Sequence, residues 1–261
     1  MGFGLGMPKA LAPLFLIALF AVSGCSSTPA EKNISSTDRA RLYVEAANGA
    51  LAEGDPTGAL VLLKKAETEN NEVPEIFHSR AIALYVKRDI KGAIESARRA
   101  VEIKPDYADA NNTLGKLLID AGDYNAAEKV LQSPASNVLY RESYKSNTSL
   151  GIIHYRRGNL AKATENLDKA IFDAPVAACM AYYYRGHVYL KKGEFKNAIR
   201  DYGLATRKVC ANFADAHLAL ATAYERNKDY ELARKKYLDI KMNFPNTKIA
   251  DQAMDRLRYL P

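Results

Sequence analysis

Four histidines, three cysteines and thirty acidic residues are the side chains of this sequence that could bind a metal or act in acid-base or nucleophilic catalysis. His78, His154, His187 and His217 are thirty or more residues apart, and none has a second histidine or a carboxylate pair at metal-binding spacing. The sequence contains neither a glycine-rich phosphate loop nor a nucleophile elbow. The carboxylates fall on expected solvent-facing helix surfaces. We therefore expect no catalysis, no metal, no cofactor and no small-molecule substrate.

The overall composition also restricts the function. The chain has 261 residues, of which 48% are hydrophobic and 26% are charged, an ordinary balance for a folded soluble protein. Its net charge is +7, from 37 basic and 30 acidic residues. These charges are interspersed along the chain, whereas a nucleic-acid-binding arm would gather the basic residues together. We therefore expect no nucleic-acid partner.

The N-terminus contains an uncharged apolar run, residues 10–22, directly after Lys9. This run is too short to span a bilayer comfortably and is typical of a secretory signal peptide. It ends in Val22-Ser23-Gly24-Cys25, which resembles the lipobox of bacterial lipoproteins, whose cysteine is acylated and becomes the first mature residue. The alternatives are a plain signal peptide or an uncleaved anchor, with Cys25 incidental.

This resemblance implies a signal peptide over residues 1–24 and a lipidated Cys25 at the start of a polar, flexible tether, residues 25–38. Ser26 follows the cysteine, where enterobacterial lipoproteins retained at the inner membrane have aspartate. The resemblance thus implies a lipid anchor in the outer membrane, with the rest of the chain facing the periplasm.

After the tether, a repeat with a period of 34 to 36 residues fills the chain. Dipeptides such as Gly122-Asp123 and Gly158-Asn159 recur a few residues before an alanine at a fixed position of the repeat. The six alanines at this position are Ala59, Ala93, Ala127, Ala163, Ala198 and Ala233. Upstream lie Leu114-Gly115 and Leu150-Gly151, and prolines such as Pro105 close three of the repeats.

This pattern resembles the tetratricopeptide repeat, in which small residues let two antiparallel helices pack closely and the glycine step turns the chain between them. The resemblance implies an all-α fold, a right-handed superhelix of six repeats over residues 39–247. Residues 248–261 have apolar residues at helical spacing and suit a capping helix. An unrelated helical bundle is the alternative.

In the register of the repeat, Cys179 opens the first helix of the fifth repeat and Cys210 takes the place of the proline that closes the second. These two ends meet in an antiparallel helical hairpin, and the periplasm is oxidising enough to form a disulfide. We expect a bond between them; two reduced, buried thiols are the alternative.

Tetratricopeptide arrays usually bind a peptide or protein segment in the concave groove lined by their first helices. The same register places a set of apolar, amide and basic side chains on that groove: Ile82, Tyr85, Asn112, Lys116, Ile119, Ile152, Tyr155, Arg156, Met180, Tyr183 and Leu190. Large apolar side chains anchor interfaces, and the basic ones favour an acidic or carboxylate-bearing partner.

One stretch narrows the resemblance further. The segments Asn111 to Leu118, Gly122-Asp123-Tyr124, Val138 to Glu142 and Asn147 to Gly151 are similar to the third and fourth repeats of the PilF/PilW/Tgl type of type IV pilus lipoprotein. The two-residue lengthening between Ala127 and Ala163 also matches that family. The aromatic residue that the family has after the Asn-Asn pair is Thr113 here.

The resemblance implies a non-enzymatic pilotin, an outer-membrane lipoprotein that helps secretin subunits of the pilus to assemble into their pore. The partner would be a secretin segment in the concave groove. A different scaffold, a periplasmic adaptor lipoprotein that gathers peptidoglycan hydrolases or other envelope machinery, is the alternative, because it would share the groove, the anchor and the charge.

The anchor is testable on its own. Replacing Cys25 by serine removes the thiol that would be acylated, and we expect C25S to move from the membrane fraction to the soluble fraction of fractionated cells. A variant that stays in the membrane fraction would contradict lipidation at this residue.

Overall fold

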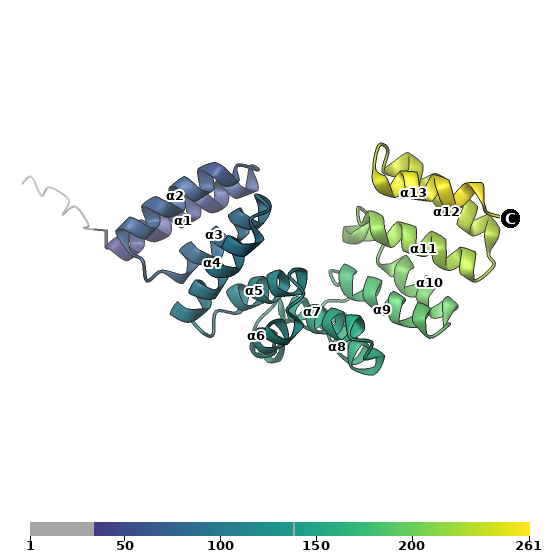
Figure 1. Ribbon diagram of the computed structural model, residues 1–261, viewed down its shortest axis with the longest axis horizontal. Helices are drawn as coiled ribbons and strands as arrows, with labels where there is room; N and C mark the ends of the chain where they lie inside the picture. Colours follow the sequence, from purple (N-terminus) through teal and green to yellow (C-terminus); the bar gives the residue numbers. More distant parts are fainter. Residues whose placement is uncertain (1–33, 138) are drawn as a thin grey trace, which may run out of the picture. The chain divides into compact units, whose positions relative to one another are not determined.

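The computed structural model describes residues 34–137 and 139–261. The expected signal peptide, Cys25 and most of the expected tether lie outside the described residues. The helices of the described residues all lie in one compact unit, Ser35–Pro261. The described residues form thirteen α-helices and a short 3₁₀ helix, and no strand (Figure 1).

Twelve of these helices form six antiparallel hairpins, and each hairpin is one repeat. The first helices are α1 (Ser36–Ala52), α3 (Pro74–Val86), α5 (Ala108–Asp120), α7 (Ser143–Arg156), α9 (Cys179–Lys191) and α11 (Ala214–Arg226). The second helices are α2 (Pro56–Glu69), α4 (Ile90–Ile103), α6 (Tyr124–Ser136), α8 (Leu160–Asp173), α10 (Phe195–Leu204) and α12 (Tyr230–Asn243). The 3₁₀ helix η1 (Lys208–Cys210) follows α10, and α13 (Lys248–Arg258) packs on α12 and α11 as the expected cap.

Helix α1 begins before the expected end of the tether. The Ser35 side chain accepts a hydrogen bond from the Asp38 backbone N–H at 3.0 Å, and its hydroxyl donates to the Asp38 carboxylate at 2.7 Å. This serine therefore caps the helix N-terminus. As a result, residues 36–38, which we assigned to the tether, lie in α1.

The turns inside the hairpins explain the recurring glycine and aspartate. Gly122 has φ of +81°, a left-handed conformation that costs glycine little, and the Asp123 side chain caps α6 by accepting from the Ala126 N–H at 3.1 Å. Arg88 and Lys228 take the same conformation in repeats two and six, each with φ of +66°. The turn geometry is thus kept in repeats that lack the glycine.

Within each hairpin, the two helices cross at small residues. An added Cβ on Gly115 would lie 2.5 Å from Leu131, one on Gly151 would lie 2.6 Å from Leu167, and one on Gly186 would lie 2.6 Å from Tyr202. The three opposing side chains have no exposed surface. The six alanines that mark the repeat are also fully buried, each in the first turn of a second helix. The spacing seen in the sequence is therefore the spacing of these close contacts.

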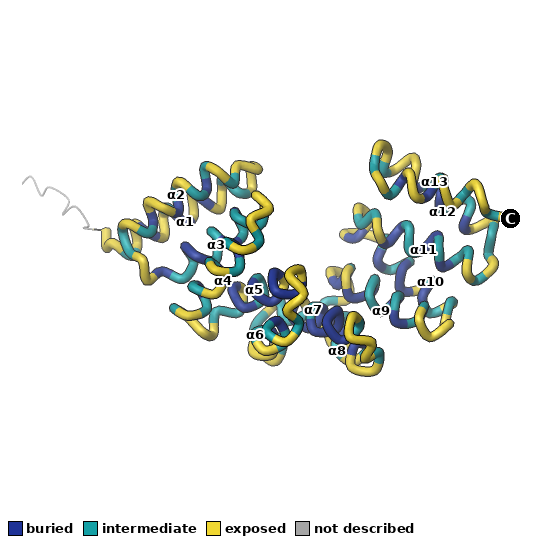
Figure 2. Tube along the Cα trace, in the orientation of Figure 1, coloured by how far each residue is buried: buried dark blue, intermediate teal, exposed yellow. Residues whose placement is uncertain are grey.

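The second helix of each repeat packs against the first helix of the next, as α6 does against α7, and most first helices also contact the first helix of the next repeat. Helix α3 contacts α1 and α5, and α7 contacts α5 and α9, whereas the second helices of neighbouring repeats make no comparable contacts. Buried residues accordingly lie between hairpins along the whole stack (Figure 2). The first helices are the more closely spaced set, so they line the inner face of the superhelix. This arrangement confirms the predicted all-α repeat fold.

Among the described residues, no helix is both long and apolar enough to cross a membrane.

The close crossing can be tested at Gly151. We expect Gly151→Ala to lower the free energy of unfolding by about 1–2 kcal/mol. Overpacking against Leu167 costs about 1–3 kcal/mol, and the higher helix propensity of alanine offsets up to about 1 kcal/mol of this cost. Thermal and urea unfolding followed by circular dichroism measure the change.

Gly49 is the matched control, since it lies inside α1 and an added Cβ would meet nothing within 4 Å. Gly49→Ala should raise the stability by up to about 1 kcal/mol. Equal effects of the two substitutions would contradict the close-packing explanation.

Candidate protein-binding groove

The inner face of the stack contains a hollow of about 450 Å³ between α5, α7 and the start of α9, which we call the first-helix groove. Six of the eleven residues predicted for a groove line it: Asn112, Lys116, Ile119, Ile152, Arg156 and Met180. Its size is in the range of pockets that hold small ligands or a few side chains. The structure therefore concentrates the predicted surface in repeats three to five.

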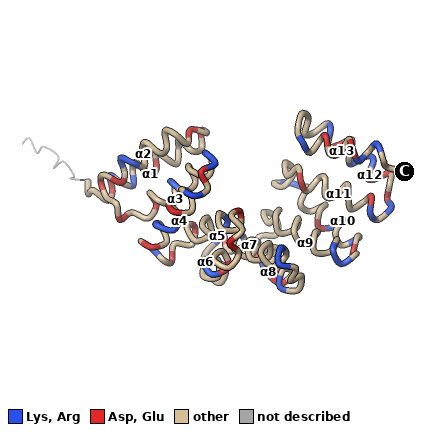
Figure 3. The backbone as a smooth tube through the Cα atoms, viewed as in Figure 1, with Lys and Arg blue, Asp and Glu red and all other residues tan. Residues whose placement is uncertain are grey.

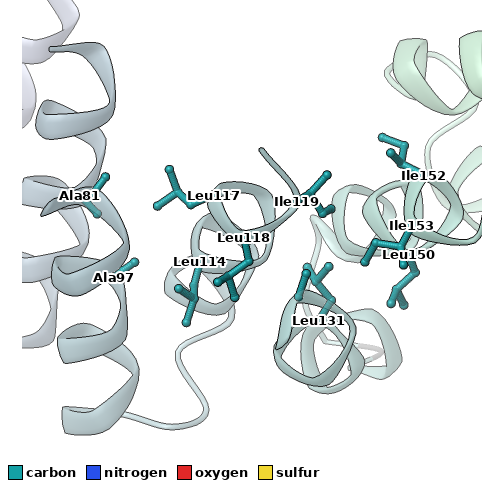
Figure 4. Close-up of a cluster of buried hydrophobic side chains, with 12 residues drawn as sticks. Ala81, Ala97, Leu114, Leu117, Leu118, Ile119, Leu131, Leu150, Ile152 and Ile153 are labelled. Carbon is teal, nitrogen blue, oxygen red and sulfur yellow. The ribbon is translucent and has the colours of Figure 1, made fainter. Parts of the chain in front are cut away.

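The floor of the first-helix groove is apolar. Ile119 and Ile152 are only 5% and 8% exposed, and both belong to a core cluster that extends down to Leu131. Figure 4 shows these two side chains, from α5 and α7, above Leu131 in this view. Met180, by contrast, is 42% exposed at the edge of the groove. The two isoleucines thus form the floor and support the core, and Met180 is the apolar side chain that is free to contact a partner.

Basic side chains lie around this floor. The Lys116 ammonium is 5.1 Å from the centre of the Tyr85 ring, and the Tyr85 hydroxyl donates a hydrogen bond to Asp120 at 3.1 Å. Arg156 donates to the backbone oxygen of Ile119 at 3.4 Å. These contacts orient the cations at the edge of the groove.

Lys145 also lines the groove and forms an ion pair with Glu142 at 2.6 Å. Asp120 is the acidic residue of the lining, against Lys116, Lys145 and Arg156. The edge therefore has an excess of positive charge and suits a partner with carboxylates.

One wall of the groove is held by a disulfide bond. Cys179 and Cys210 are bonded, with their Cα atoms 5.6 Å apart, and Cys179 is part of the lining. Cys210 is buried in η1, so the bond ties the start of α9 to the segment that follows α10.

The other five predicted residues lie outside the lining. Tyr155 and Tyr183 belong to an aromatic cluster with Tyr184, His187, Tyr202 and Phe213. Leu190 packs against the core between repeats five and six. Ile82 is half-buried on α3, and Tyr85 reaches the groove only through its contacts with Lys116 and Asp120.

Sequence reasoning missed Tyr144, Thr148 and Tyr184, which line the groove. The helical period could have found them. Thr148 and Tyr144 precede Ile152 by four and eight residues, and Tyr184 follows Met180 by four, so each lies on the face that was already identified.

His187 is the ionisable group at the centre of the aromatic cluster. Its Nδ1 is 2.7 Å from the Tyr202 hydroxyl, and its ring lies 4.3 Å from that of Tyr183. Burial lowers the pKa of His187 to about 4, and the nearby positive charge of Lys191 contributes to this shift. The histidine is therefore neutral at physiological pH. No group of three or more potential metal ligands occurs in the described part of the chain.

Models of known protein families match these helices. Two models described as tetratricopeptide repeat match, one at residues 44–108, 148–208 and 183–246 and the other at residues 87–137. Together they cover well over half of the chain. The chain belongs to the tetratricopeptide repeat family. Repeats of this family are protein-interaction modules, which agrees with a groove lined by anchors and charges.

A protein of pilus assembly resembles this chain in sequence. The chain is 26% identical to the type IV pilus assembly protein PilF of Pseudomonas aeruginosa PAO1 over 165 residues, which are 61% of this chain and 65% of that protein. A solved structure of Pseudomonas aeruginosa PilF has a TM-score of 0.71 at 19% identity, covering 85% of this chain and 99% of that one.

The crystal structure of PilW, a type IV pilus biogenesis factor, has a TM-score of 0.73 at 19% identity, covering 82% of this chain and 98% of that one. A chain of the APC/C hetero-tetramer Cut9-Hcn1 also has a TM-score of 0.73, at 18% identity, and here 43% of that chain is covered. At these identities the structural similarity shows the tetratricopeptide repeat fold alone.

The burial of His187 predicts a pH dependence of stability in this tetratricopeptide repeat protein. Its folded pKa of about 4 lies below the ordinary value of 6.5, so the unfolded chain binds more protons between these pH values. His187 therefore lowers the stability as the pH falls from about 7 to 4, by up to about 3 kcal/mol.

We expect His187→Gln, which keeps an acceptor for Tyr202, to lose stability less steeply over this range than the native chain. Burial also lowers the pKa of His78, His154 and His217, and their contributions are common to both proteins. Melting temperatures at half-unit steps of pH measure the difference. Parallel curves for the two proteins would contradict the assignment to His187.

Proposed function

We propose that this protein is a lipid-anchored component of type IV pilus biogenesis that assists assembly of the pilus secretin, with a secretin segment bound in the first-helix groove. The sequence match to PilF across 165 residues is the observation that carries this proposal. The similarity of fold to PilF and PilW over more than 80% of the chain is consistent with it.

The groove favours a particular kind of secretin segment. Ile119, Ile152 and Met180 offer an apolar surface, and Lys116, Lys145 and Arg156 surround it with positive charge. A segment with one or two large apolar side chains beside aspartate, glutamate or a terminal carboxylate would satisfy both features. The basic edge would guide the segment to the groove, and the apolar contacts would supply most of the affinity.

The proposed anchor would keep the start of the repeats near the outer membrane. Lipidation of Cys25 would leave the nine residues from Ser26 to Ile34 between the acyl chains and the capped start of α1. Even fully extended, nine residues span only about 30 Å. The repeats would then meet secretin subunits as these arrive at the periplasmic side of that membrane.

The experiment measures the amount of heat- and detergent-resistant secretin multimer in outer membranes, and it follows the secretin monomer in the same cells. Deletion of the gene should abolish the multimer and leave the monomer. Met180→Glu, which puts a negative charge at the exposed edge of the groove, should reduce the multimer several-fold.

Val61→Glu is the matched control, because Val61 is 55% exposed on α2 and lies outside the groove lining. It should leave the multimer unchanged. Unchanged multimer after gene deletion would overturn the pilotin role and favour the adaptor of cell-wall machinery, for which a pull-down of peptidoglycan hydrolases is the next measurement.

A further inference from the structure

The second-helix face of the stack contains a separate cleft between α10 and α12. Helix α10 has 10 residues, whereas α8 and α12 have 14 each. After Leu204 the chain leaves the helix and runs to η1, where Cys210 is bonded to Cys179. A cleft of about 470 Å³ lies beside this early end, and we call it the α10–α12 cleft.

Gly203 keeps the cleft open. It lies in the last turn of α10, and a Cβ added there would meet only the Arg207 guanidinium, at 3.9 Å. Gly203 thus differs from Gly115, Gly151 and Gly186, where an added Cβ would collide with a buried side chain. A larger side chain at position 203 can therefore enter the cleft without disturbing the packing of the hairpin.

The cleft is strongly basic. Arg200, Arg207, Lys235 and Lys236 line it, and Asp239 is the acidic residue of the lining. Arg200 already pairs with the buried Asp201 at 3.3 Å, which leaves three cations against one carboxylate. Lys236 is half-buried, and this burial lowers the pKa of its amine. An incoming carboxylate would offset the loss of hydration that the lysine has already undergone.

Apolar side chains continue outward from the same cleft. Leu232 lines it and is 50% exposed, and Leu238 and Met242, on the outward side of α12, are 43% and 70% exposed. These three residues lie on one side of the helix, with Lys235 between them. Figure 3 shows Lys and Arg on both α10 and α12. The surface therefore pairs an apolar stripe with a positive cleft.

We propose that the α10–α12 cleft is a second docking site, which binds an acidic amphipathic helix of a protein partner. Such a helix would lay its leucine-like face on Leu232 and Met242 and direct its carboxylates to Arg207, Lys235 and Lys236. It would occupy the space left by the missing last turn of α10. This site is separate from the first-helix groove and does not rest on the proposed function.

The test uses the full chain in phosphatidylcholine nanodiscs and a fluorescein-labelled 14-residue peptide with leucine on one helical face and glutamate on the other. Fluorescence anisotropy should show saturable binding of this peptide. A scrambled peptide of the same composition, with no apolar face, should bind at least tenfold more weakly.

Two variants locate the binding. Lys235→Glu and Gly203→Phe should each weaken it at least tenfold, the first by reversing a charge in the cleft and the second by filling the cleft. Lys241→Glu makes the same charge change on α12 outside the cleft lining and should stay within twofold of the native chain. Circular dichroism confirms that each variant is folded.

Three results would overturn the proposal. These are no saturable binding of the amphipathic peptide, equal weakening by Lys235→Glu and Lys241→Glu, or binding of anionic phosphatidylglycerol vesicles with the same dependence on Lys235 while the peptide does not bind. The last result would assign the cleft to a lipid surface.

Discussion

The structure depends on one steric constraint, the absence of a large side chain where the two helices of each repeat cross. Gly115, Gly151 and Gly186 occupy this position, and an added Cβ would lie 2.5 or 2.6 Å from a fully buried side chain of the second helix. Because interiors are close-packed, no rearrangement within the hairpin can make this space cheaply. The crossing fixes each hairpin, and each hairpin then packs on the next, through its second helix against the following first helix and through contacts between first helices. The first-helix groove is a consequence of that stacking, and the α10–α12 cleft lies where one second helix ends early.

A polar side chain four residues before this crossing explains how the repeats tolerate loops of different length. Asn111, Asn147, Tyr182 and His217 occupy this position, and each hydrogen-bonds to a backbone carbonyl before its own helix, of Pro105, Ala135, Pro175 and Ala211 respectively. Amide, phenol and imidazole groups serve equally, since each offers at least one N–H or O–H donor. The sequence motif containing Asn111 and Asn147, which resembles the pilus lipoproteins, is therefore at least partly a structural device. The loops can vary in length because this bond holds the preceding segment of the chain to each first helix.

The repeat fold could be predicted because its signals are local: a small residue, a glycine step and an alanine at a fixed spacing. The groove was only partly predictable, since a residue on a first helix can face the groove, the core or a neighbouring repeat. The Ile119 and Ile152 side chains line the groove and also belong to the core. The Tyr183 ring packs against the rings of Phe213 and His187 instead of lining the groove. The early end of α10 was not predictable from spacing, because Ala205 keeps its repeat position and is buried just after the helix ends. That end depends on the path of the chain to η1, which involves residues distant in sequence.

Both hollows border the fifth repeat, whose irregularity links them. Cys179 lines the first-helix groove, while Thr206 and Arg207, a few residues before Cys210, line the α10–α12 cleft. The disulfide joins these two segments through the body of the repeat. In a regular repeat, a longer second helix would fill the cleft, and only noncovalent packing would hold the start of the first helix. The fifth repeat has lost that last helical turn, and the covalent bond compensates by limiting the freedom of the chain on both sides. The disulfide bond thus supports one wall of each candidate binding surface. This covalent support allows the fifth repeat to depart from the regular pattern next to both surfaces.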